Sequence, residues 1–222
     1  FINSSVALYD YFKKCALKAI ELCDKTPQIL FSNLRYLGLE AENKMYQHTL
    51  GVNTHKGAIF SFGLIVAATA YLSENGRNTA ADNILDLCAE MAQLSMADFE
   101  NQNIHKSFGK QIFKEQNIKG VRGQAAAGYP AVREAYPLLC QLLKEEKSVD
   151  KAGAKVLLKL LCEVQDTNII KRSDLKTLEE IQKKAKIILD SDNTETELGQ
   201  LNREFVNLNI SPGGCADLLA IC

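Results

Sequence analysis

The chain has 222 residues, of which 46% are hydrophobic and 24% are charged, as is usual for a globular protein with a sizeable core. Its net charge of −1 gives no basic excess that would favour nucleic acid as a partner, and it includes no acidic tail. The seven scattered cysteines form no CxxC pair, which is typical of a reduced protein and predicts a cytoplasmic location.

Apolar residues recur with the helical period along most of the chain. We expect Asn3-Ser4-Ser5 to cap a first helix that ends at Thr26-Pro27, and residues 98–107 to be only weakly periodic. The other predicted helices lie near residues 34–50, 57–72, 79–97, 108–116, 125–143 with an interruption at 128–130, 149–164, 175–188, 195–206 and from 216 onward. No run alternates apolar and polar residues as a strand would. We therefore predict an all-α protein, a single compact domain of about eight to ten helices over residues 1–222.

The predicted helix over residues 57–72 is the centre of this fold. It is apolar nearly all round, which is typical of a helix buried among other helices. Ser61, Gly63 and Thr69 interrupt it, so it falls short of the ~18 uninterrupted apolar residues of a membrane span. A core helix is the prediction.

A polar turn precedes this helix, with the sequence Gly51-Val52-Asn53-Thr54-His55-Lys56-Gly57. Lysine and histidine in a first helical turn oppose the helix dipole, unless a ligand there supplies negative charge. Backbone N–H groups at a helix start suit phosphate, so the turn is a candidate anion site. The alternative is that Asn53 or Thr54 is only an N-cap, and that His55 and Lys56 are solvated.

Three further turns share this character, with glycine, small polar groups and a charge beside an apolar helix. They are residues 120–124, 166–172 and 211–217. Gly-Val-Arg-Gly at 120–123 flanks Arg122 with glycines, which gives up helix stability to place its guanidinium. Asp166-Thr167-Asn168 presents oxygen ligands of the kind magnesium prefers, or else is a C-cap.

The fourth turn, Ser211-Pro212-Gly213-Gly214, offers N–H groups to phosphate, with Asp217 following. Its alternatives are an ordinary Gly-Gly turn and a first-turn carboxylate that satisfies the helix dipole. Together the four turns are more typical of a site for a polyphosphate and its metal than of four unrelated turns.

The four motifs also carry a family resemblance. Gly-Val-Asn-Thr-His-Lys-Gly-Ala-Ile-Phe-Ser at 51–61, Gly-Val-Arg-Gly-Gln-Ala at 120–125, Asp-Thr-Asn at 166–168 and Asn-Ile-Ser-Pro-Gly-Gly-Cys-Ala-Asp-Leu-Leu at 209–219 stand in this order. The chain thereby resembles the triphosphoribosyl-dephospho-coenzyme A synthase family over nearly its whole length. The resemblance implies an all-helical cytosolic enzyme that joins ATP to the ribose 2′-hydroxyl of 3′-dephospho-CoA and releases adenine, with Mg²⁺ accompanying the ATP. The product would be the prosthetic-group precursor of the acyl carrier protein of citrate lyase or malonate decarboxylase, which a separate transferase attaches.

The resemblance implies roles for the motif residues. Catalytic roles fall to His55, Asp166 and Asp217, one of them as general base, and Asp166 and Asp217 are also the expected magnesium ligands. The nucleotide-binding residues are expected to be Asn53, Thr54, Lys56, Gly57, Arg122, Gly123, Asn168, Arg172, Ser211, Gly213 and Gly214. Among these, Lys56, Arg122 and the N–H groups of Ser211, Gly213 and Gly214 would clamp the triphosphate.

The chain departs from the family pattern in places. The family usually has Glu where this chain has Gln124, which cannot act as a base, and Arg-Gly-Gly where this chain has Arg172-Ser173-Asp174. An N-terminal family segment is also expected to be missing. These departures support an alternative, a non-catalytic helical ATP-binding sensor or partner protein. A purely structural bundle would leave the clustered polar turns unexplained.

Overall fold

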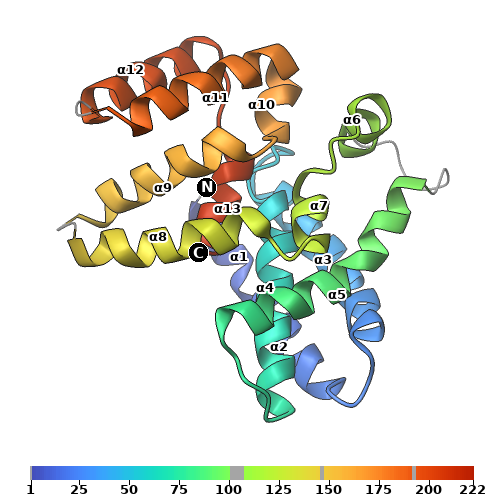
Figure 1. Cartoon of the computed structure of the whole chain (residues 1–222). Coiled ribbons are helices and arrows are strands. Elements are labelled where there is room, and N and C mark those ends of the chain that lie inside the picture. Colours follow the sequence, from blue (N-terminus) through green and yellow to red (C-terminus); the bar gives the residue numbers. More distant parts are fainter. Residues whose placement is uncertain (1, 101–107, 146–147, 192–193) are drawn as a thin grey trace. The chain divides into compact units, whose positions relative to one another are not determined.

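The structure, a computed structural model, describes residues 2–100, 108–145, 148–191 and 194–222. Within these ranges the chain forms thirteen helices and no strand (Figure 1), which confirms the all-α prediction. The count exceeds the predicted eight to ten because the expected first helix is divided and because two polar turns, near 120 and 166, contain short helices. Most of the weakly periodic segment, residues 101–107, lies outside the described residues.

The chain divides into two compact units. Unit 1 comprises residues 1–105, 121–129 and 221, and unit 2 comprises residues 106–120, 130–220 and 222. The assignment of residues 1–222 to one catalytic domain stays a prediction.

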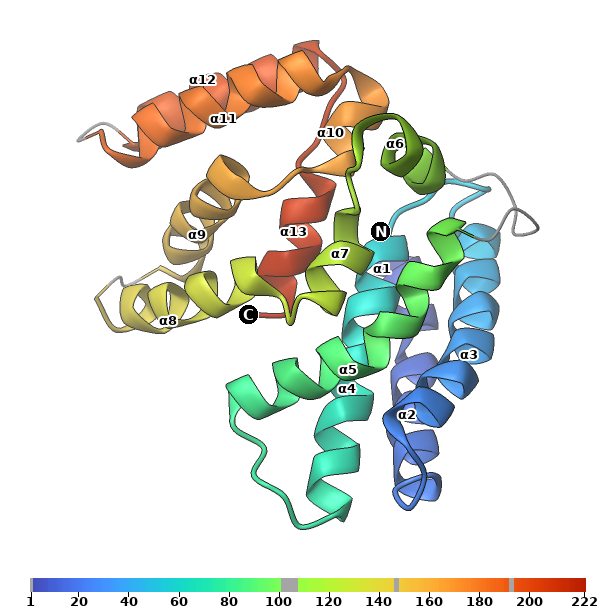
Figure 2. The ribbon, with the colours of Figure 1, turned by 45° about the vertical axis from the view of Figure 1, so that its right-hand side comes forward.

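Unit 1 is built around α4, which spans Lys56–Glu74 and confirms the predicted central helix. It packs against α2 (Tyr9–Glu21), α3 (Pro27–His48) and α5 (Ala81–Glu100), as Figure 2 shows. Among the described helices, α4 is the one whose length and composition would allow a membrane crossing, a property that core helices of soluble proteins share. Its contacts with three neighbouring helices fit the core-helix prediction.

The close approach of α2 and α4 depends on Gly63. The buried Tyr11 of α2 lies against this glycine, and its hydroxyl donates a hydrogen bond of 3.0 Å to the Ile59 carbonyl. A Cβ at position 63 would lie 2.2 Å from the Tyr11 hydroxyl oxygen, so no larger residue fits without displacing the ring. Burial raises the pKa of Tyr11, which keeps the hydroxyl protonated as a donor.

The first predicted helix is two helices, α1 (Ile2–Ala7) followed by α2. Ser4, expected as part of a cap, lies inside α1 and is fully buried. Its hydroxyl is 3.3 Å from that of Thr54, in the turn before α4. The correction has a physical reason, since this serine has a tertiary hydrogen-bonding partner 50 residues away and does not act as a local cap.

Unit 2 is organised around α9 (Val149–Glu163), which packs against α8, α11 and α13. Helix α11 in turn contacts α10 and α12, and Figure 1 shows α11 and α12 side by side. The bounds of the remaining helices are α6 Phe108–Gln116, α7 Gly120–Ala126, α8 Pro130–Glu145, α10 Thr167–Arg172, α11 Leu175–Leu189, α12 Thr194–Asn207 and α13 Gly213–Ala220. A cap residue precedes α11: the Asp174 side chain accepts the Thr177 N–H at 2.7 Å.

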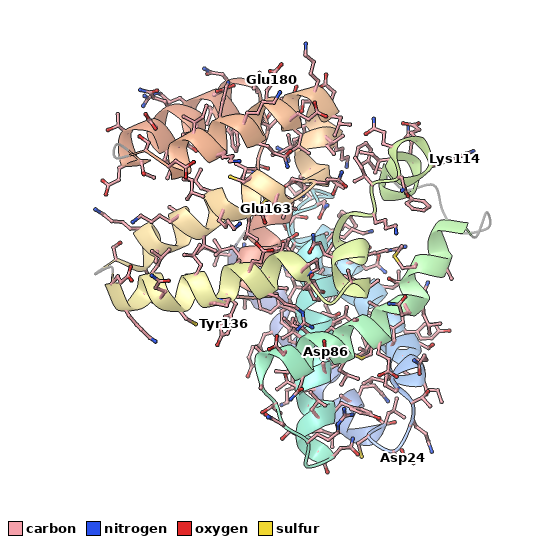
Figure 3. The ribbon with its side chains drawn as sticks, viewed as in Figure 1. Asp24, Asp86, Lys114, Tyr136, Glu163 and Glu180 are labelled. Carbon is pink, nitrogen blue, oxygen red and sulfur yellow. The ribbon has the colours of Figure 1, made fainter. Side chains whose placement is uncertain are left out.

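Charged side chains occupy the outer faces of both units. Asp24 after α2 and Asp86 on α5 are exposed in unit 1, and Glu163 and Glu180 are exposed in unit 2 (Figure 3). Many periodic apolar positions are buried as the pattern predicts, among them Leu34 and Met45, whereas Tyr9 and Leu39 are exposed.

Candidate functional site

The turn before α4 is held by its own side chains. The side-chain Oδ1 of Asn53 accepts the backbone N–H of Lys56 at 3.1 Å, so Asn53 satisfies a donor of the first helical turn. His55 is the residue immediately before the helix, and Lys56 is its first residue. The N-cap is therefore His55, not Asn53 or Thr54, although the Asn53 side chain accepts the N–H of the first helical residue. Any contact of Asn53 with ribose would use the rest of its amide.

His55 lies among three hydroxyl groups. Its Nδ1 is 2.9 Å from Thr54 Oγ1 and 3.1 Å from Ser4 Oγ, and its Nε2 is 3.1 Å from Ser5 Oγ. Burial lowers the pKa of this imidazole, which favours the neutral ring at pH 7. The ring therefore ties α1 to the turn, and its use as a general base would require one of these hydroxyls to give way to the substrate.

Folding stability should respond to pH through His55. Because the folded state lowers the pKa below the usual 6.5, the unfolded chain binds the proton more readily, and stability falls as pH drops through about 6.5. We expect the free energy of unfolding, measured in urea by circular dichroism, to be lower at about pH 5.5 than at pH 7. His55→Asn should reduce this change of the free energy of unfolding with pH, whereas substitution of the exposed His48 should leave the change as it is. An identical change with pH in His55→Asn and the unaltered chain would contradict the expectation.

The ammonium group of Lys56 has a protein partner. Its Nζ lies 2.7 Å from Oε2 of Glu42, which is on α3. Sequence reasoning missed Glu42, because it lies 14 residues away in an ordinary amphipathic pattern and in no motif. The cation at the start of α4 is thus balanced in part by a carboxylate of the protein.

Glu42 also lines a pocket in unit 1, with a volume of about 140 Å³. Arg122, from the motif at 120–125, lines the same pocket directly. The motif at 51–61 reaches the pocket indirectly, because its Lys56 is bonded to the lining residue Glu42. The lining residues are Tyr11, Phe31, Leu34, Arg35, Gly38, Leu39, Glu42, Ile59, Phe60, Gly63, Leu64, Ser95 and Arg122.

The second motif is not the loop that its glycines suggested. Residues Gly120–Ala126 form helix α7, which includes Arg122, Gly123 and Gln124. Gly120 begins it with φ of +55°, and a Cβ there would lie 3.2 Å from Thr167 Cγ2 in unit 2. Two glycines in seven residues are tolerated because the helix is anchored by tertiary contacts, including a 2.8 Å hydrogen bond from Gln93 to the Ala126 carbonyl. Arg122 is therefore presented from a helical turn.

Asp166 is the buried polar centre of unit 2, with only 1% of its surface exposed. Its Oδ1 accepts the N–H groups of Asn168 at 2.8 Å and Ile169 at 3.3 Å, and its Oδ2 accepts that of Cys215 at 2.9 Å. It is the N-cap of α10, not part of a C-cap, and it also holds the first turn of α13. Burial raises the pKa of this carboxyl, and the three N–H donors oppose that rise.

The third and fourth motifs pack directly on each other. A Cβ at Gly213 would lie 2.8 Å from Asn168 Nδ2, and one at Gly214 would lie 3.1 Å from Asp166 Oδ2. These glycines are thus required by close contact with two motif side chains, which goes beyond an ordinary turn. The exposed Arg172 donates to the Asn209 carbonyl at 3.5 Å, which places it beside the start of the same motif.

The remaining expected site residues are only partly covered by protein. Thr54, Gly57, Ser211 and Asp217 are half-buried, and Lys56 is more exposed. Partial exposure of this kind leaves a side chain accessible to a ligand.

The expected magnesium ligands do not fit equally well. Both oxygens of Asp166 already accept hydrogen bonds from backbone N–H groups, so coordination there would leave buried donors unsatisfied. Across the described ranges, no group of three or more His, Cys, Asp or Glu residues gathers as a metal site. Asp217, the other expected magnesium ligand, is half-buried on α13, and its role at a metal stays a prediction.

Comparisons with known proteins agree with these motifs. The sequence profile of the family described as ATP:dephospho-CoA triphosphoribosyl transferase matches residues 1–222. Proteins of Streptococcus mutans and Lactiplantibacillus plantarum are each 32% identical to the chain, over 100% of this chain and 81% of theirs, and both carry the provisional name 2-(5''-triphosphoribosyl)-3'-dephosphocoenzyme-A synthase. A crystal structure of an Archaeoglobus fulgidus protein, provisionally named a triphosphoribosyl-dephospho-CoA synthase, has a TM-score of 0.58 at 16% identity, over 99% of this chain and 94% of that one. That last likeness shows the fold alone.

Proposed function

The chain belongs to the ATP:dephospho-CoA triphosphoribosyl transferase family, and we propose that it transfers the triphosphoribosyl group of ATP to the ribose 2′-hydroxyl of 3′-dephospho-CoA, releasing adenine. The observation that carries the proposal is the family match over all 222 residues, which includes the four polar motifs. The alternative of a non-catalytic ATP-binding protein is not favoured, because the relatives that match the whole chain carry synthase names.

The reaction exchanges one bond at the anomeric carbon of the ATP ribose. The bond from C1′ to N9 breaks and its electron pair stays on adenine, while a bond forms from C1′ to the acceptor 2′-oxygen. The proton lost by that hydroxyl balances the one gained by adenine. The transition state has oxocarbenium character, so it favours nearby negative charge and a positioned base. The triphosphate is carried over intact.

In unit 1, Lys56 and Arg122 are the proposed cations for the triphosphate, one as a compact charge and the other as a planar fork. In unit 2, the N–H groups of Gly213 and Gly214 at the start of α13 are proposed as phosphate donors. The N–H of Cys215 already donates to Asp166, so it is not proposed as a phosphate donor. Asp166 is proposed to hold this turn in place through that hydrogen bond.

The acceptor hydroxyl requires a proton acceptor. Asp217 and the neutral imidazole of His55 are the two candidates among the expected residues, since Asp166 is buried under three donors. Asn53, Asn168 and Arg172 are proposed to orient the nucleotide. Mg²⁺ is proposed to arrive with ATP, to neutralise phosphate charge and to meet Asp217 directly or through water.

We further propose a cytoplasmic location, where ATP and 3′-dephospho-CoA are available to a chain with seven free thiols. The product would then pass, through a separate transferase, to the acyl carrier protein of citrate lyase or malonate decarboxylase.

The test is adenine release, followed by chromatography. The chain is incubated with ATP and Mg²⁺, with and without 3′-dephospho-CoA. Adenine that appears only with the acceptor is the expected result, and it would make Gln124 a tolerated residue. Adenine without the acceptor would point to a hydrolase acting at the same carbon, and no adenine in either case would contradict the proposal.

A further inference from the structure

We propose that the pocket of unit 1 binds an adenine ring, and that Glu42 selects this base. The inference rests on the proposed function, because both substrates, ATP and 3′-dephospho-CoA, carry adenine. The motif residues account for binding of the phosphates, but none of them accounts for binding of the base.

The apolar part of the pocket suits a flat ring. Phe31, Leu34, Ile59 and Leu64 line it, and all four are buried in the core, so their positions are set before a ligand binds. Its volume of about 140 Å³ is close to the ~150 Å³ of an apolar cavity that takes up benzene. The two fused rings of adenine would fill the pocket and leave one edge of the base at the pocket's opening.

Glycine makes part of the room for such a ring. Gly38 lies within α3 and lines the pocket. The nearest atom to a Cβ at this position would be the Tyr11 hydroxyl, at 3.8 Å, which is ordinary contact. Packing therefore does not require glycine here, and glycine within a helix costs about 1 kcal/mol relative to alanine. Space for a ligand explains its presence.

The polar groups of the pocket match the edge of adenine. The Glu42 carboxylate can accept from the exocyclic amine, whereas the carbonyl oxygen of guanine or hypoxanthine at the same position would face it as a second acceptor. The Arg35 guanidinium, 5.9 Å from the centre of the Phe31 ring, can donate to a ring nitrogen. A donor to a ring nitrogen also stabilises the electron pair that adenine keeps on departure.

Of the two adenine rings, the geometry favours that of ATP. Glu42 is bonded to Lys56, the proposed triphosphate cation, and Arg122 lines the same pocket. A nucleotide with its base against Glu42 would thus have cations of unit 1 at hand for its phosphates.

The experiment compares Gly38→Leu, which fills the pocket, with Gly38→Ala, which fills it only slightly. Gly153→Leu on α9 is the matched control, because a Cβ there meets nothing within 4 Å. Adenine binding is measured by calorimetry, and the Michaelis constants for ATP and for 3′-dephospho-CoA are measured by adenine release. Thermal melting checks that each variant is folded.

We expect Gly38→Leu to abolish adenine binding and to raise the Michaelis constant for ATP at least about tenfold (~1.4 kcal/mol), with Gly38→Ala between it and the unaltered chain. Gly153→Leu should change neither quantity. A rise confined to 3′-dephospho-CoA would assign the pocket to the acceptor's adenine. Unchanged adenine binding and unchanged constants in a folded Gly38→Leu chain would overturn the proposal.

Glu42→Gln supplies an independent test, should leucine at position 38 prevent folding. Because glutamine can donate where glutamate only accepts, this variant should lose affinity for adenine and gain affinity for hypoxanthine. Equal loss of both would overturn the selective role of Glu42. If adenine binds as described but no acceptor-dependent adenine release occurs, the proposed function fails and the pocket assignment stands. If acceptor-dependent release occurs but neither variant changes adenine binding, the pocket assignment fails and the proposed function stands.

Discussion

Asp166→Ala is expected to lower the free energy of unfolding by about 4 kcal/mol, the largest loss of stability that we predict for a single motif side chain. The substitution removes the shared acceptor of three backbone N–H groups, from Asn168, Ile169 and Cys215, in a place closed to water. Buried donors without a partner carry a desolvation penalty of about 1–3 kcal/mol each, and helices α10 and α13 lose the side chain that they share. Urea unfolding followed by circular dichroism measures the effect.

Asp174→Ala is the matched control for this prediction. Asp174 is also an N-cap, of α11, where its side chain accepts the Thr177 N–H, but it is exposed to water. Its loss should lower the free energy of unfolding by only about 1 kcal/mol. Equal losses in the two variants would show that Asp166 is an ordinary cap and does not join two helices.

Arg122→Ala is expected to reduce kcat/KM for ATP about 100-fold, which corresponds to about 2.7 kcal/mol of transition-state stabilisation. Arg122 lines the unit 1 pocket from α7, and a bidentate contact of its guanidinium with phosphate would be stronger than an ordinary hydrogen bond. Arg122→Lys retains the charge without the fork, so its loss should be smaller, about tenfold. Adenine release at varied ATP concentration measures both.

Arg77→Ala is the control, because this exposed arginine follows α4 at the far end from Lys56 and lines no site described above. Its kcat/KM should match that of the unaltered chain. The clamp assignment fails if Arg122→Ala, folded by thermal melting, also keeps the full kcat/KM.

Much of the local structure follows from the sequence. Apolar spacing predicts the central helix, and α4 runs over Lys56–Glu74, close to the predicted residues 57–72. The motif strings also identify the family, whose profile matches the whole chain. These features are local: a helix repeats every 3.6 residues, and a motif is a contiguous string.

The reason for a glycine at two motif positions lies in tertiary contacts. Gly120 and Gly213 were both expected in polar turns that a ligand approaches, yet each lies where a Cβ would press on another motif side chain, Thr167 or Asn168. A glycine in a sequence indicates either a special backbone conformation or a close approach. The neighbour that makes the approach close can be identified only from the fold.

The partners of the site were decided by tertiary structure alone. Periodicity shows which face of α3 is buried, but it does not show that Glu42 meets Lys56 or that Arg35 and Gly38 line a pocket with Arg122. Likewise, the sequence identifies Asp166 as a carboxylate suited to a metal, and only the packing of α10 against α13 shows that its oxygens are already bonded to N–H groups. The sequence by itself thus determined the helices, the motifs and the family, because these depend on neighbours along the chain. Which charges are paired, and where space remains for a base, depend on neighbours in space.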